Sequence, residues 1–523
     1  FIRNNLYMIV KMKINPFVIL VFASLFCFIS CSEKHSLPVA ENIEFEQVYI
    51  PVIQGETATI AYLNFNLEKE EYLRQFEVEM ASGTTIENVS VTLVGEEEQD
   101  KFINGVYDSK SHLWRLKEEI VLEKGKQQLA IKVSIPEDAD LKSKFSLNVP
   151  LIEIGEEKCL PDGLGNIKPW RPATALRTAN DDEVAAFRIP GLATSNSGVL
   201  LAVYDVRHEN SSDLQGDIDV GLSRSHDGGI TWEPMQIIMD MGEWGGLPQN
   251  QNGIGDPAIL VDNETGAIYV VALWIHGKPG TAAWRSSEPG LSPEKTGQLM
   301  LVKSEDDGRT WSSPRNITQP MKEASWQLFF NGPGKGISMK NGTLVFAAQY
   351  KDKEQIPHST IIFSKDHGET WQVGSGARPK TTEAQVVELE DGRLMLNMRD
   401  DRGGSRAIYT TADMGNSWQE HPTNRSALIE PICMASLIKF GEDRLFFSNP
   451  ATTEGRFNIT IKASNDDGLT WPDNQQILLD GQKGWGYSCL TKINEEEIGV
   501  LYESSQAHMT FQIVPIAEFN AYK

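Results

Sequence analysis

An eight-residue pattern that recurs five times constrains the fold of this chain more than any other feature. The pattern is [S/T]-x-D-x-G-x-[S/T]-W, and it occurs at Ser225–Trp232, Ser304–Trp311, Ser364–Trp371, Thr411–Trp418 and Ser464–Trp471. Its residue types suit a tight turn, because aspartate accepts hydrogen bonds from the turn's own backbone, glycine tolerates a positive φ, and tryptophan packs against a sheet. A calcium loop is the alternative, but each copy has too few carboxylates for the roughly six to eight oxygen ligands of Ca²⁺. We therefore interpret the repeats as structural turns and expect no metal in them.

Six predicted β-hairpins alternate with these repeats. Each consists of two strand-like runs around a short polar turn, and the first five are followed by a strand, one copy of the repeat and another strand. Recurring four-stranded units are typical of β-propeller blades. Residues 167–523 number 357, which gives about 60 residues for each of six blades. We therefore predict an all-β, six-bladed propeller over residues 167–523. The predicted hairpins are Phe187–Asp205, Asp256–Trp274, Lys335–Gln349, Glu383–Arg399, Met434–Asn449 and Tyr487–Glu503.

The region before the propeller reads as a separate, smaller β domain. Residues 36–160 are rich in glutamate and contain short β-rich runs separated by polar turns, which predicts a β-sandwich. Proline and glycine residues between 161 and 172 mark a linker. The region has no convincing catalytic cluster, so a carbohydrate-binding role and a structural spacer both remain open.

The N-terminus resembles an export signal. Lys11 and Lys13 precede an apolar run of about 15 residues, which is shorter than the roughly 20 residues of a membrane-spanning helix. Phe28-Ile-Ser-Cys31 resembles a lipobox, in which the cysteine becomes the lipid-bearing first residue of a bacterial lipoprotein. Residues 1–31 are therefore expected to be a lipoprotein signal peptide with Cys31 as the lipidation site; ordinary signal cleavage is the alternative. The expected location is beyond the inner membrane, lipid-anchored in the outer membrane, either periplasmic or surface-exposed.

Charge and cysteine content exclude several function classes. Lys and Arg number 48 and Asp and Glu number 72, so the net charge is 48 − 72 = −24. Nucleic acids and anionic membranes require a basic face, so neither is expected as the main partner, and membrane contact is expected only through the lipid anchor. The other cysteines, at 159, 433 and 489, form neither a disulfide framework nor a cluster with zinc spacing.

Unusual polar residues concentrate at one end of the predicted blades. In an antiparallel blade, the start of the first strand, the end of the second and the start of the third lie at the same end. Ten polar residues fall at these places, so all should lie on one face of the propeller, where the blades converge on the axis. They are Arg188, Asp205, Arg207, Asp213, Asp256, Glu383, Arg399, Arg456, Tyr487 and Glu503.

Three of these residues are arginines from different blades. Arg188, Arg399 and Arg456 can converge, and guanidinium groups bind carboxylates in a two-pronged geometry. Their presence in a strongly acidic protein predicts capture of a carboxylate-bearing ligand. Asp213 and Glu383 come from different blades, as a pair of acid–base groups requires.

From about residue 170 to its end, the chain resembles the bacterial exo-sialidases, a family of secreted glycoside hydrolases. Phe187-Arg-Ile-Pro190 matches the opening motif of that family, and the five repeats match its Asp boxes. The other landmarks occur in the family's order: Glu383-Ala-Gln-Val-Val-Glu-Leu, Asn397-Met-Arg399, Arg456-Phe-Asn-Ile-Thr, Tyr487-Ser and Gly499-Val-Leu-Tyr-Glu503.

The resemblance implies a role for each residue. It implies that Arg188, Arg399 and Arg456 hold the carboxylate of sialic acid and that Glu503 orients Arg188. It implies Tyr487 as nucleophile, Glu383 as its base and Asp213 as general acid and base, with Arg207 and Asp256 near the hydroxyl and amide side of the sugar. A neutral tyrosine suits this substrate, because a carboxylate nucleophile would be repelled by the carboxylate on the anomeric carbon; sialidases depart in this way from the two-carboxylate scheme of glycosidases.

Several alternatives remain open from the sequence. Asp205 lies near Asp213, although the spacing from Arg188 and the polar loop before Asp213 favour Asp213. The predicted function is retaining hydrolysis of terminal sialic acids from glycans or glycoproteins, without a cofactor. Intramolecular trans-sialidase activity would use the same residues, and a non-catalytic carbohydrate-binding propeller is the third alternative. The insertion Trp274–Gly297 is expected either to wall the pocket or to be a plain surface loop.

Overall fold

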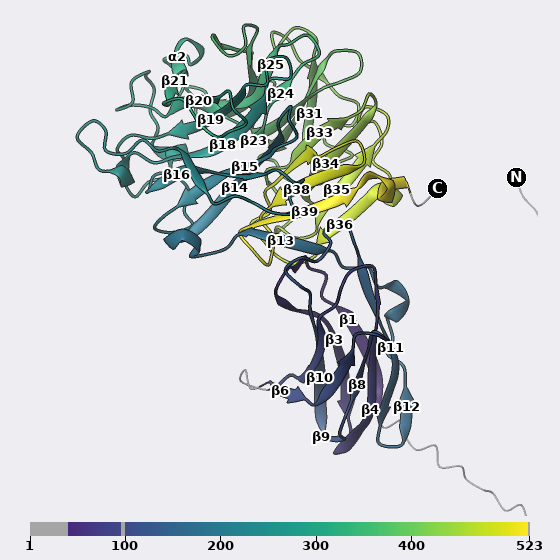
Figure 1. Cartoon of the computed structure of the whole chain (residues 1–523). Helices are drawn as coiled ribbons and strands as arrows, with labels where there is room; N and C mark the ends of the chain where they lie inside the picture. Colours follow the sequence, from purple (N-terminus) through teal and green to yellow (C-terminus); the bar gives the residue numbers. More distant parts are fainter. Residues whose placement is uncertain (1–39, 96–99, 521–523) are drawn as a thin grey trace, which may run out of the picture.

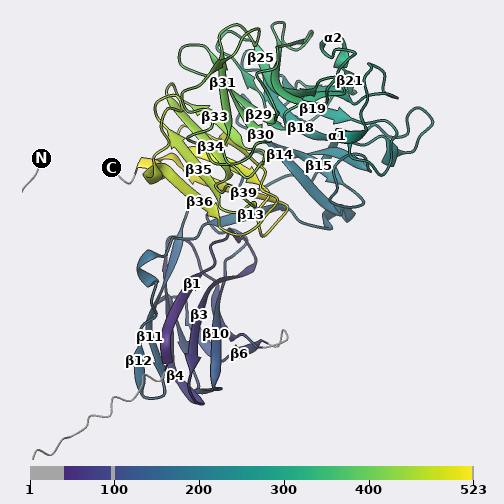
Figure 2. The same cartoon turned by 180° about the vertical axis from the view of Figure 1, so that it is seen from behind.

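The computed structural model describes residues 40–95 and 100–520, which form two β-rich bodies (Figures 1 and 2). The smaller body lies below the propeller in both views and contains the purple and dark-blue strands. The expected signal peptide and Cys31 lie outside the described residues. No helix in the described part of the chain combines the length and apolar character needed to cross a membrane.

The smaller body is a sandwich of two antiparallel sheets. One sheet has the order β1 (Ala40–Gln47), β3 (Thr57–Leu67), β10 (Gly125–Ser134), β5 (Asn88–Leu93) and β6 (Lys101–Ile103). The other has the order β12 (Glu157–Cys159), β11 (Phe145–Ile154), β4 (Glu71–Ser82), β8 (Leu113–Leu116) and β7 (Gly105–Asp108), with β9 (Ile120–Leu122) beside β4. Leu63, Phe65 and Leu67 of β3 are buried in the shared core, whereas the residues between them are partly exposed, as expected for a strand with one buried face.

Six sheets of the larger body, each with four main strands, confirm the predicted propeller. Blade one contains β14 (Ala186–Thr194), β15 (Leu200–Arg207), β16 (Ile218–Ser225) and β17 (Gln236–Met239). Blade two contains β18 (Ile254–Val261), β19 (Ile268–Trp274), β20 (Gln298–Ser304) and β21 (Arg315–Asn316). Blade three contains β22 (Leu328–Asn331), β25 (Leu344–Lys351), β26 (Pro357–Ser364) and β27 (Gln372–Val373), with the short strands β24 (Ile337–Ser338) and β28 (Arg378–Pro379).

The remaining blades follow the same order. Blade four contains β29 (Thr381–Glu388), β30 (Leu394–Asp400), β31 (Ala407–Thr411) and β32 (Gln419–Glu420). Blade five contains β33 (Ser436–Phe440), β34 (Arg444–Pro450), β35 (Ile459–Ser464) and β36 (Gln476–Asp480). Blade six contains β37 (Ser488–Lys492), β38 (Glu497–Tyr502), β39 (Met509–Pro515) and β13 (Pro172–Arg177). The helical segments are α1 (Ala283–Ser286), α2 (Thr318–Met321), η2 (Leu164–Asn166), η3 (Asp181–Glu183), η4 (Gln249–Gln251), η5 (Asp473–Gln475) and η6 (Ile516–Asn520).

The ring is closed by the segment that precedes blade one. β13 pairs antiparallel with β39, so the first strand of the larger body becomes the outer strand of its last blade. The sandwich continues this sheet, because β2 (Val52–Ile53) pairs with β13. Arg171, which precedes β13, and Lys144 of the sandwich both bind the carboxylate of Glu518. Blade six therefore joins the two ends of the propeller and contacts the sandwich.

The first strand of blade three differs from its predicted form. The sequence predicts a hairpin that starts at Lys335, but the chain pairs with β25 twice, first as β22 and then as β24. Between them, β23 (Gly334–Lys335) leaves the sheet and pairs with β18 of blade two. Gly332 and Gly336 flank this excursion, and a Cβ at either position would lie 2.8 Å or less from backbone oxygens of neighbouring strands. The excursion therefore depends on close backbone approach, which glycine allows.

The five repeats form the turns between the third and fourth strands of blades one to five, where the sequence places them. In the first copy, Asp227 accepts hydrogen bonds from Thr231 N at 2.9 Å, Thr231 Oγ1 at 2.6 Å and Ser225 Oγ at 2.8 Å. The equivalent bonds hold the pKa of Asp306 and of Asp413 at about 2. The aspartate thus binds donors of its own turn, as the turn interpretation predicts.

Candidate active site

Five of the predicted site residues line one cavity of about 240 Å³. They come from blades one, two, four and six, which places the cavity at the propeller axis. The opposite wall is apolar and comes from blades two and three. The polar members are Asp213, Asp256, Glu383, Arg399 and Tyr487, and the apolar wall includes Leu273, Ala283, Trp284, Leu328 and Phe330.

Bulges in three first strands present polar residues at this end of the axis. The pairing register shifts between Arg188 and Gly191 in β14, between Gly255 and Ala258 in β18, and between Thr381 and Ala384 in β29. Arg188, Asp256 and Glu383 lie at these shifts. A bulge bends the strand and changes the direction of a side chain, and bulges occur often beside active sites. Blades one, two and four therefore use the same local device.

Tyr487, Glu383 and Arg399 form the most closely packed polar group of the cavity. The hydroxyl of Tyr487 donates to Oε1 of Glu383 at 2.5 Å. Nη1 of Arg399 donates to Oε2 of Glu383 at 2.6 Å and to the hydroxyl oxygen of Tyr487 at 3.0 Å. Burial raises the pKa of Tyr487 well above its ordinary value, and the negative charge of Glu383 raises it further. The phenol is therefore neutral at rest, with a carboxylate in place to accept its proton.

The three predicted arginines meet around Tyr487. The guanidinium carbon of Arg188 lies 5.8 Å from the centroid of the Tyr487 ring, and that of Arg456 lies 5.5 Å from it. Arg399 bonds the hydroxyl of the same residue. The Nε of Arg399 is buried and has no hydrogen-bond partner among the described residues. These positions leave permanent positive charge, and at least one unused donor, beside the phenol.

Glu503 holds two of these residues in place. It is fully buried, and its Oε1 accepts from Nε of Arg188 at 2.7 Å and from the backbone N–H of Ile189 at 3.0 Å. Its Oε2 accepts from the backbone N–H of Tyr487 at 3.0 Å. One carboxylate therefore connects the arginine of blade one to the segment that presents Tyr487 in blade six.

Asp213 and Asp205 lie in opposite environments. Asp213 is on the loop between β15 and β16; its side chain is 76 % exposed, lines the cavity and accepts from Nη1 of Arg207 at 2.9 Å. Asp205 is buried, and both its oxygens are occupied, Oδ2 by Arg207 at 2.8 Å and Oδ1 by the backbone N–H of Asp256 at 2.8 Å. Arg207 therefore connects the two carboxylates, and only Asp213 faces the cavity.

Asp256 lies among several other carboxylates of the site. Removal from water raises its pKa well above the ordinary value, and the charges of Asp205, Asp213 and Glu383 act in the same direction. Its backbone adopts a positive φ of 57° at the bulge of β18. A carboxyl group that stays protonated can donate a hydrogen bond, which an ionised one cannot.

The apolar wall is the part of the site that sequence reasoning only partly foresaw. Trp284 lies on α1, in the insertion between β19 and β20, and lines the cavity, as one of the two expectations for that insertion stated. Its ring lies 6.4 Å from that of Phe330, which comes from β22 of blade three. Trp274 is buried and does not line the cavity. Phe330 and Leu328 carry no motif, and only the folded ring brings them beside Trp284.

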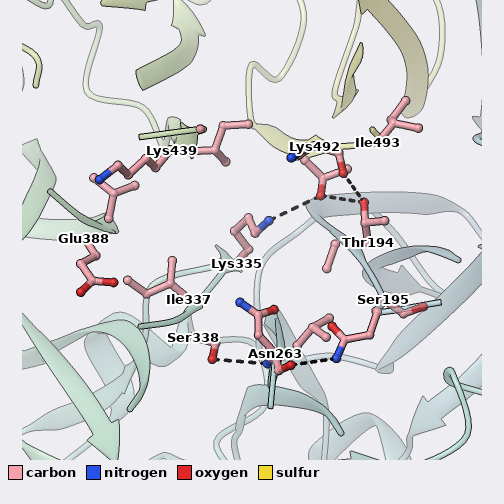
Figure 3. A pocket seen from close by; sticks show the side chains of 18 of the residues that line it. Thr194, Ser195, Asn263, Lys335, Ile337, Ser338, Glu388, Lys439, Lys492 and Ile493 are labelled. Atoms are coloured by element: carbon pink, nitrogen blue, oxygen red, sulfur yellow. Dashed lines mark hydrogen bonds between the residues drawn. The ribbon is translucent and has the colours of Figure 1, made fainter. Parts of the chain in front are cut away.

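A larger cavity of about 640 Å³ occupies the opposite mouth of the axis (Figure 3). It is lined by the turns and strand ends where the first hairpin of each blade closes, including Asn263, Ser338 and Lys492. Lys335 and Lys439 extend into it. None of the ten predicted polar residues lines this cavity, so the site belongs to the smaller cavity.

Comparisons with known proteins agree with this fold. Residues 189–503 match a BNR repeat-like domain family. A sialidase of Bacteroides fragilis is 44% identical over 95% of this chain and 98% of its own length. The solved structure of a Hadza microbial sialidase, Hz136, covers 91% of this chain and 99% of its own with a TM-score of 0.82 and 43% identity. The intramolecular trans-sialidase of Ruminococcus gnavus, at 19% identity and a TM-score of 0.55, covers 67% of this chain and 99% of its own and shares the fold.

Proposed function

This chain belongs to the sialidase family of glycoside hydrolases, and within that family we propose that it is a retaining exo-α-sialidase. It would release terminal sialic acids from glycans or glycoproteins through a covalent intermediate on Tyr487. The observation that carries this proposal is the 2.5 Å hydrogen bond from Tyr487 to Glu383, at a tyrosine that three arginines contact.

The arginines supply the binding energy for a carboxylate. A sialic acid carries this group on the anomeric carbon, and guanidinium groups bind carboxylates through charge-assisted hydrogen bonds. Although burial disfavours the charged form, Glu503 keeps the pKa of Arg188 above its ordinary value, and Glu383 does the same for Arg399. Both stay positive in a protein whose net charge is −24. A carboxylate bound here places the anomeric carbon beside the hydroxyl of Tyr487.

The first chemical step forms a bond between the Tyr487 oxygen and the anomeric carbon and breaks the bond from that carbon to the leaving oxygen. Glu383 accepts the phenol proton as the oxygen attacks, so the nucleophile meets the anionic substrate without a prior negative charge. Asp213 gives its proton to the leaving oxygen. In the second step Asp213 takes a proton from water, the hydroxyl displaces Tyr487, and Glu383 returns the proton to the phenol oxygen. Two displacements at one carbon retain its configuration.

The choice of Asp213 over Asp205 rests on access. A general acid must reach the leaving oxygen, and Asp213 is exposed at the cavity whereas both oxygens of Asp205 are occupied. Asp256, kept protonated, is suited to donate to a hydroxyl or amide oxygen of the sugar. The apolar wall around Trp284 and Phe330 is suited to the acyl group.

Covalent trapping tests this mechanism. With a fluorinated sialoside that has a good leaving group, the covalent intermediate forms quickly and is hydrolysed slowly. Mass spectrometry of the digested protein should therefore find the sugar on Tyr487. Tyr487→Phe should lose nearly all activity on every substrate and take up no label. Label on any other residue contradicts the mechanism.

Intramolecular transfer would use the same groups and differ in what attacks the intermediate. Product analysis by NMR with 2,3- and 2,6-linked sialyllactose separates the two: hydrolysis releases free sialic acid, and transfer releases an anhydro sugar. Free sialic acid is the expected product. A non-catalytic propeller would release neither.

Membrane anchoring through Cys31 is a second proposal, which rests on the lipobox-like sequence Phe28-Ile-Ser-Cys31. Cys31→Ala should convert a membrane-bound protein into a soluble one, because the variant has no attachment site for the acyl chains. A variant that fractionates with membranes as the wild type does contradicts this proposal.

A further inference from the structure

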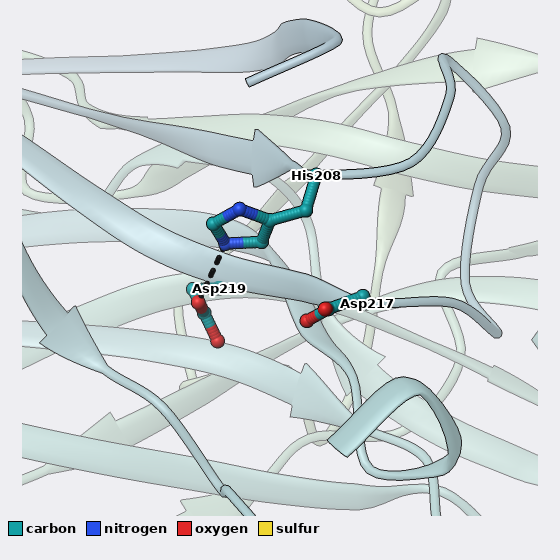
Figure 4. Close-up of side chains that lie close together, drawn as sticks. All are labelled: His208, Asp217 and Asp219. Carbon is teal, nitrogen blue, oxygen red and sulfur yellow. Dashed lines mark hydrogen bonds and ion pairs between the residues drawn. The ribbon is translucent and has the colours of Figure 1, made fainter. Parts of the chain in front are cut away.

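Three side chains lie close together at the two ends of the loop that carries Asp213: His208 at one end, and Asp217 and Asp219 at the other (Figure 4). His208 directly follows β15, and Asp219 is the second residue of β16. The backbone N–H of His208 donates to the backbone oxygen of Asp217 at 3.0 Å, so the ends of the loop lie side by side. The three side chains thus gather where the loop leaves and re-enters the blade.

The three side chains offer ligand atoms at the spacing of a metal site. One ligand atom from each residue lies within 4.8 Å of the other two. Nε2 of His208 lies 2.9 Å from Oδ2 of Asp219, and Asp217 faces the same space. The side chain of His208 is 34% exposed, which leaves a route from solvent.

Two carboxylate oxygens in this group lack partners. Asp219 is 4% exposed, and its Oδ1 has no hydrogen-bond partner among the described residues. The same holds for Oδ1 of Asp217. A buried acceptor without a partner costs free energy, and such groups in a native protein call for an occupant or an explanation.

The charges around the group are unbalanced as well. Burial raises the pKa of Asp219, and the nearby charge of Asp240 raises it further, although the hydrogen bond from His208 opposes this. Burial also raises the pKa of Asp217; His208 opposes this shift, and the charges of Glu209 and Asp240 add to it. A single imidazole can carry at most one positive charge against these carboxylates, whereas a divalent cation supplies two.

We propose that His208, Asp217 and Asp219 form a binding site for a divalent first-row transition metal, with Zn²⁺ as the metal to test. An imidazole nitrogen with two carboxylate oxygens is a ligand set that Zn²⁺ accepts, and water completes its coordination. Ca²⁺ and Mg²⁺ prefer oxygen ligands alone, so the histidine argues against them. The ion would hold the two ends of the Asp213 loop together and so act on the reaction through the position of Asp213.

Binding of Zn²⁺ to the purified, untagged, metal-free chain tests this site. Isothermal titration should show one saturating equivalent, and the Tm should rise with Zn²⁺ concentration, because a ligand of the folded state stabilises it. All proteins carry Cys159→Ser, since Cys159 is a partly exposed free thiol that can also bind Zn²⁺. Ca²⁺ and Mg²⁺ should bind far more weakly.

Variants of the ligands complete the test. His208→Asn and Asp217→Asn should each weaken Zn²⁺ binding by at least about tenfold. Mutation of a residue that only hydrogen-bonds a metal ligand already lowers metal affinity by about 10–100-fold, and here a ligand itself is lost. His226→Asn is the matched control, because His226 also pairs with a carboxylate, Glu233, at 3.1 Å but lies on a repeat turn. It should bind as the wild type does. Asp217 is less buried than Asp219, so its variant tests the site if substitution of Asp219 prevents folding.

Two results would overturn the proposal. One is the absence of saturable Zn²⁺ binding by the folded wild type. The other is binding that survives both His208→Asn and Asp217→Asn, which would place the ion elsewhere. Either outcome leaves hydrolysis by Tyr487 untouched, because the ion has no part in the bond changes, so this test fails independently of the proposed function.

Discussion

The hydroxyl of Tyr487 lies 2.5 Å from Oε1 of Glu383, although the two residues are 104 positions apart. Tyr487 directly precedes β37 of blade six, and Glu383 lies at the bulge of β29 in blade four. They meet because first strands of all blades run beside the axis, so residues at equivalent strand starts converge there. This contact couples a buried neutral phenol to the group that can take its proton, and the predictions below start from it.

Removal of Asp213 should affect substrates according to their leaving group. A sugar leaving group needs a proton, so Asp213→Ala should lower the rate on sialyllactose by roughly 10²–10⁴. An aryl sialoside with an acidic phenol needs little assistance, and its first step should suffer far less. Burst kinetics on both substrates measure the difference.

Asp401→Ala is the control for that experiment, since Asp401 lines the same cavity without a proposed role. Its effect should be similar for both leaving groups. If Asp213→Ala also lowers both rates equally, the acid is another residue, and Asp205 is the first to examine.

Glu503→Gln should impair binding and stability together. The buried carboxylate of Glu503 accepts hydrogen bonds from Arg188, Ile189 N and Tyr487 N. The neutral amide of the variant leaves the guanidinium of Arg188 without its negative partner. Leaving a buried charge without its partner costs about 3–5 kcal/mol. KM should rise and kcat fall, and calorimetry should show a lower Tm.

The matched variant is Glu495→Gln, which removes an exposed pair with Lys492. Exposed pairs contribute about 0–1 kcal/mol, so its Tm should change little. A Glu503→Gln protein with wild-type KM and Tm would show that Arg188 is positioned by other contacts.

The sandwich should be dispensable for the chemical step. The sandwich contacts blade six through β2, β36 of blade five through Tyr49, and η6 through Lys144. None of these partners lines the cavity. A chain starting at Arg171 keeps β13 and omits Trp170, which is buried in the sandwich core and stacks on Phe145. This truncated chain should hydrolyse an aryl sialoside with nearly unchanged kcat and have a lower Tm.

Polymeric glycans distinguish two roles for the sandwich. A loss confined to glycoprotein substrates would support carbohydrate binding by the sandwich. A large fall in kcat on the aryl sialoside in a well-folded truncate would instead show that the sandwich helps to shape the site.

The raised pKa of Asp256 predicts how stability depends on pH. Its folded pKa lies above its unfolded value near 4, so its contribution is complete below pH 4 and is lost as pH rises toward the folded pKa. The amide side chain of the Asp256→Asn variant does not ionise in this pH range. The Tm of the variant relative to the wild type should therefore rise between pH 4 and 8.

For Asp413→Asn, the Tm of the variant relative to the wild type should rise as pH falls from 4 toward 2, which is the opposite direction of pH change from Asp256→Asn. Turn donors hold the pKa of Asp413 at about 2, so its contribution to stability is present above pH 4 and is lost as pH falls toward 2.

A constant Tm difference for Asp256→Asn across pH 4 to 8 would mean that Asp256 is ionised in the folded protein.

The sequence by itself determined the architecture and the face that carries the site. Turns and strands form from residues that are close in the sequence. The repeated Asp, Gly and Trp positions and the alternating hairpins can therefore be recognised from the sequence alone. Strand polarity then places Arg188, Glu383 and Tyr487 at the same end of their blades, because antiparallel pairing leaves no other arrangement.

Only the tertiary structure decided what depends on distance through space. Closure of the ring by β13, the excursion of β23 and the joining of Phe330 to the wall beside Trp284 all link distant segments, and none has a local pattern. Asp205 and Asp213 have the same side chain eight residues apart, yet one is buried with both oxygens occupied and the other is exposed at the cavity. Burial and partner geometry set the chemistry of a carboxylate, and both arise only when the blades pack around a common axis.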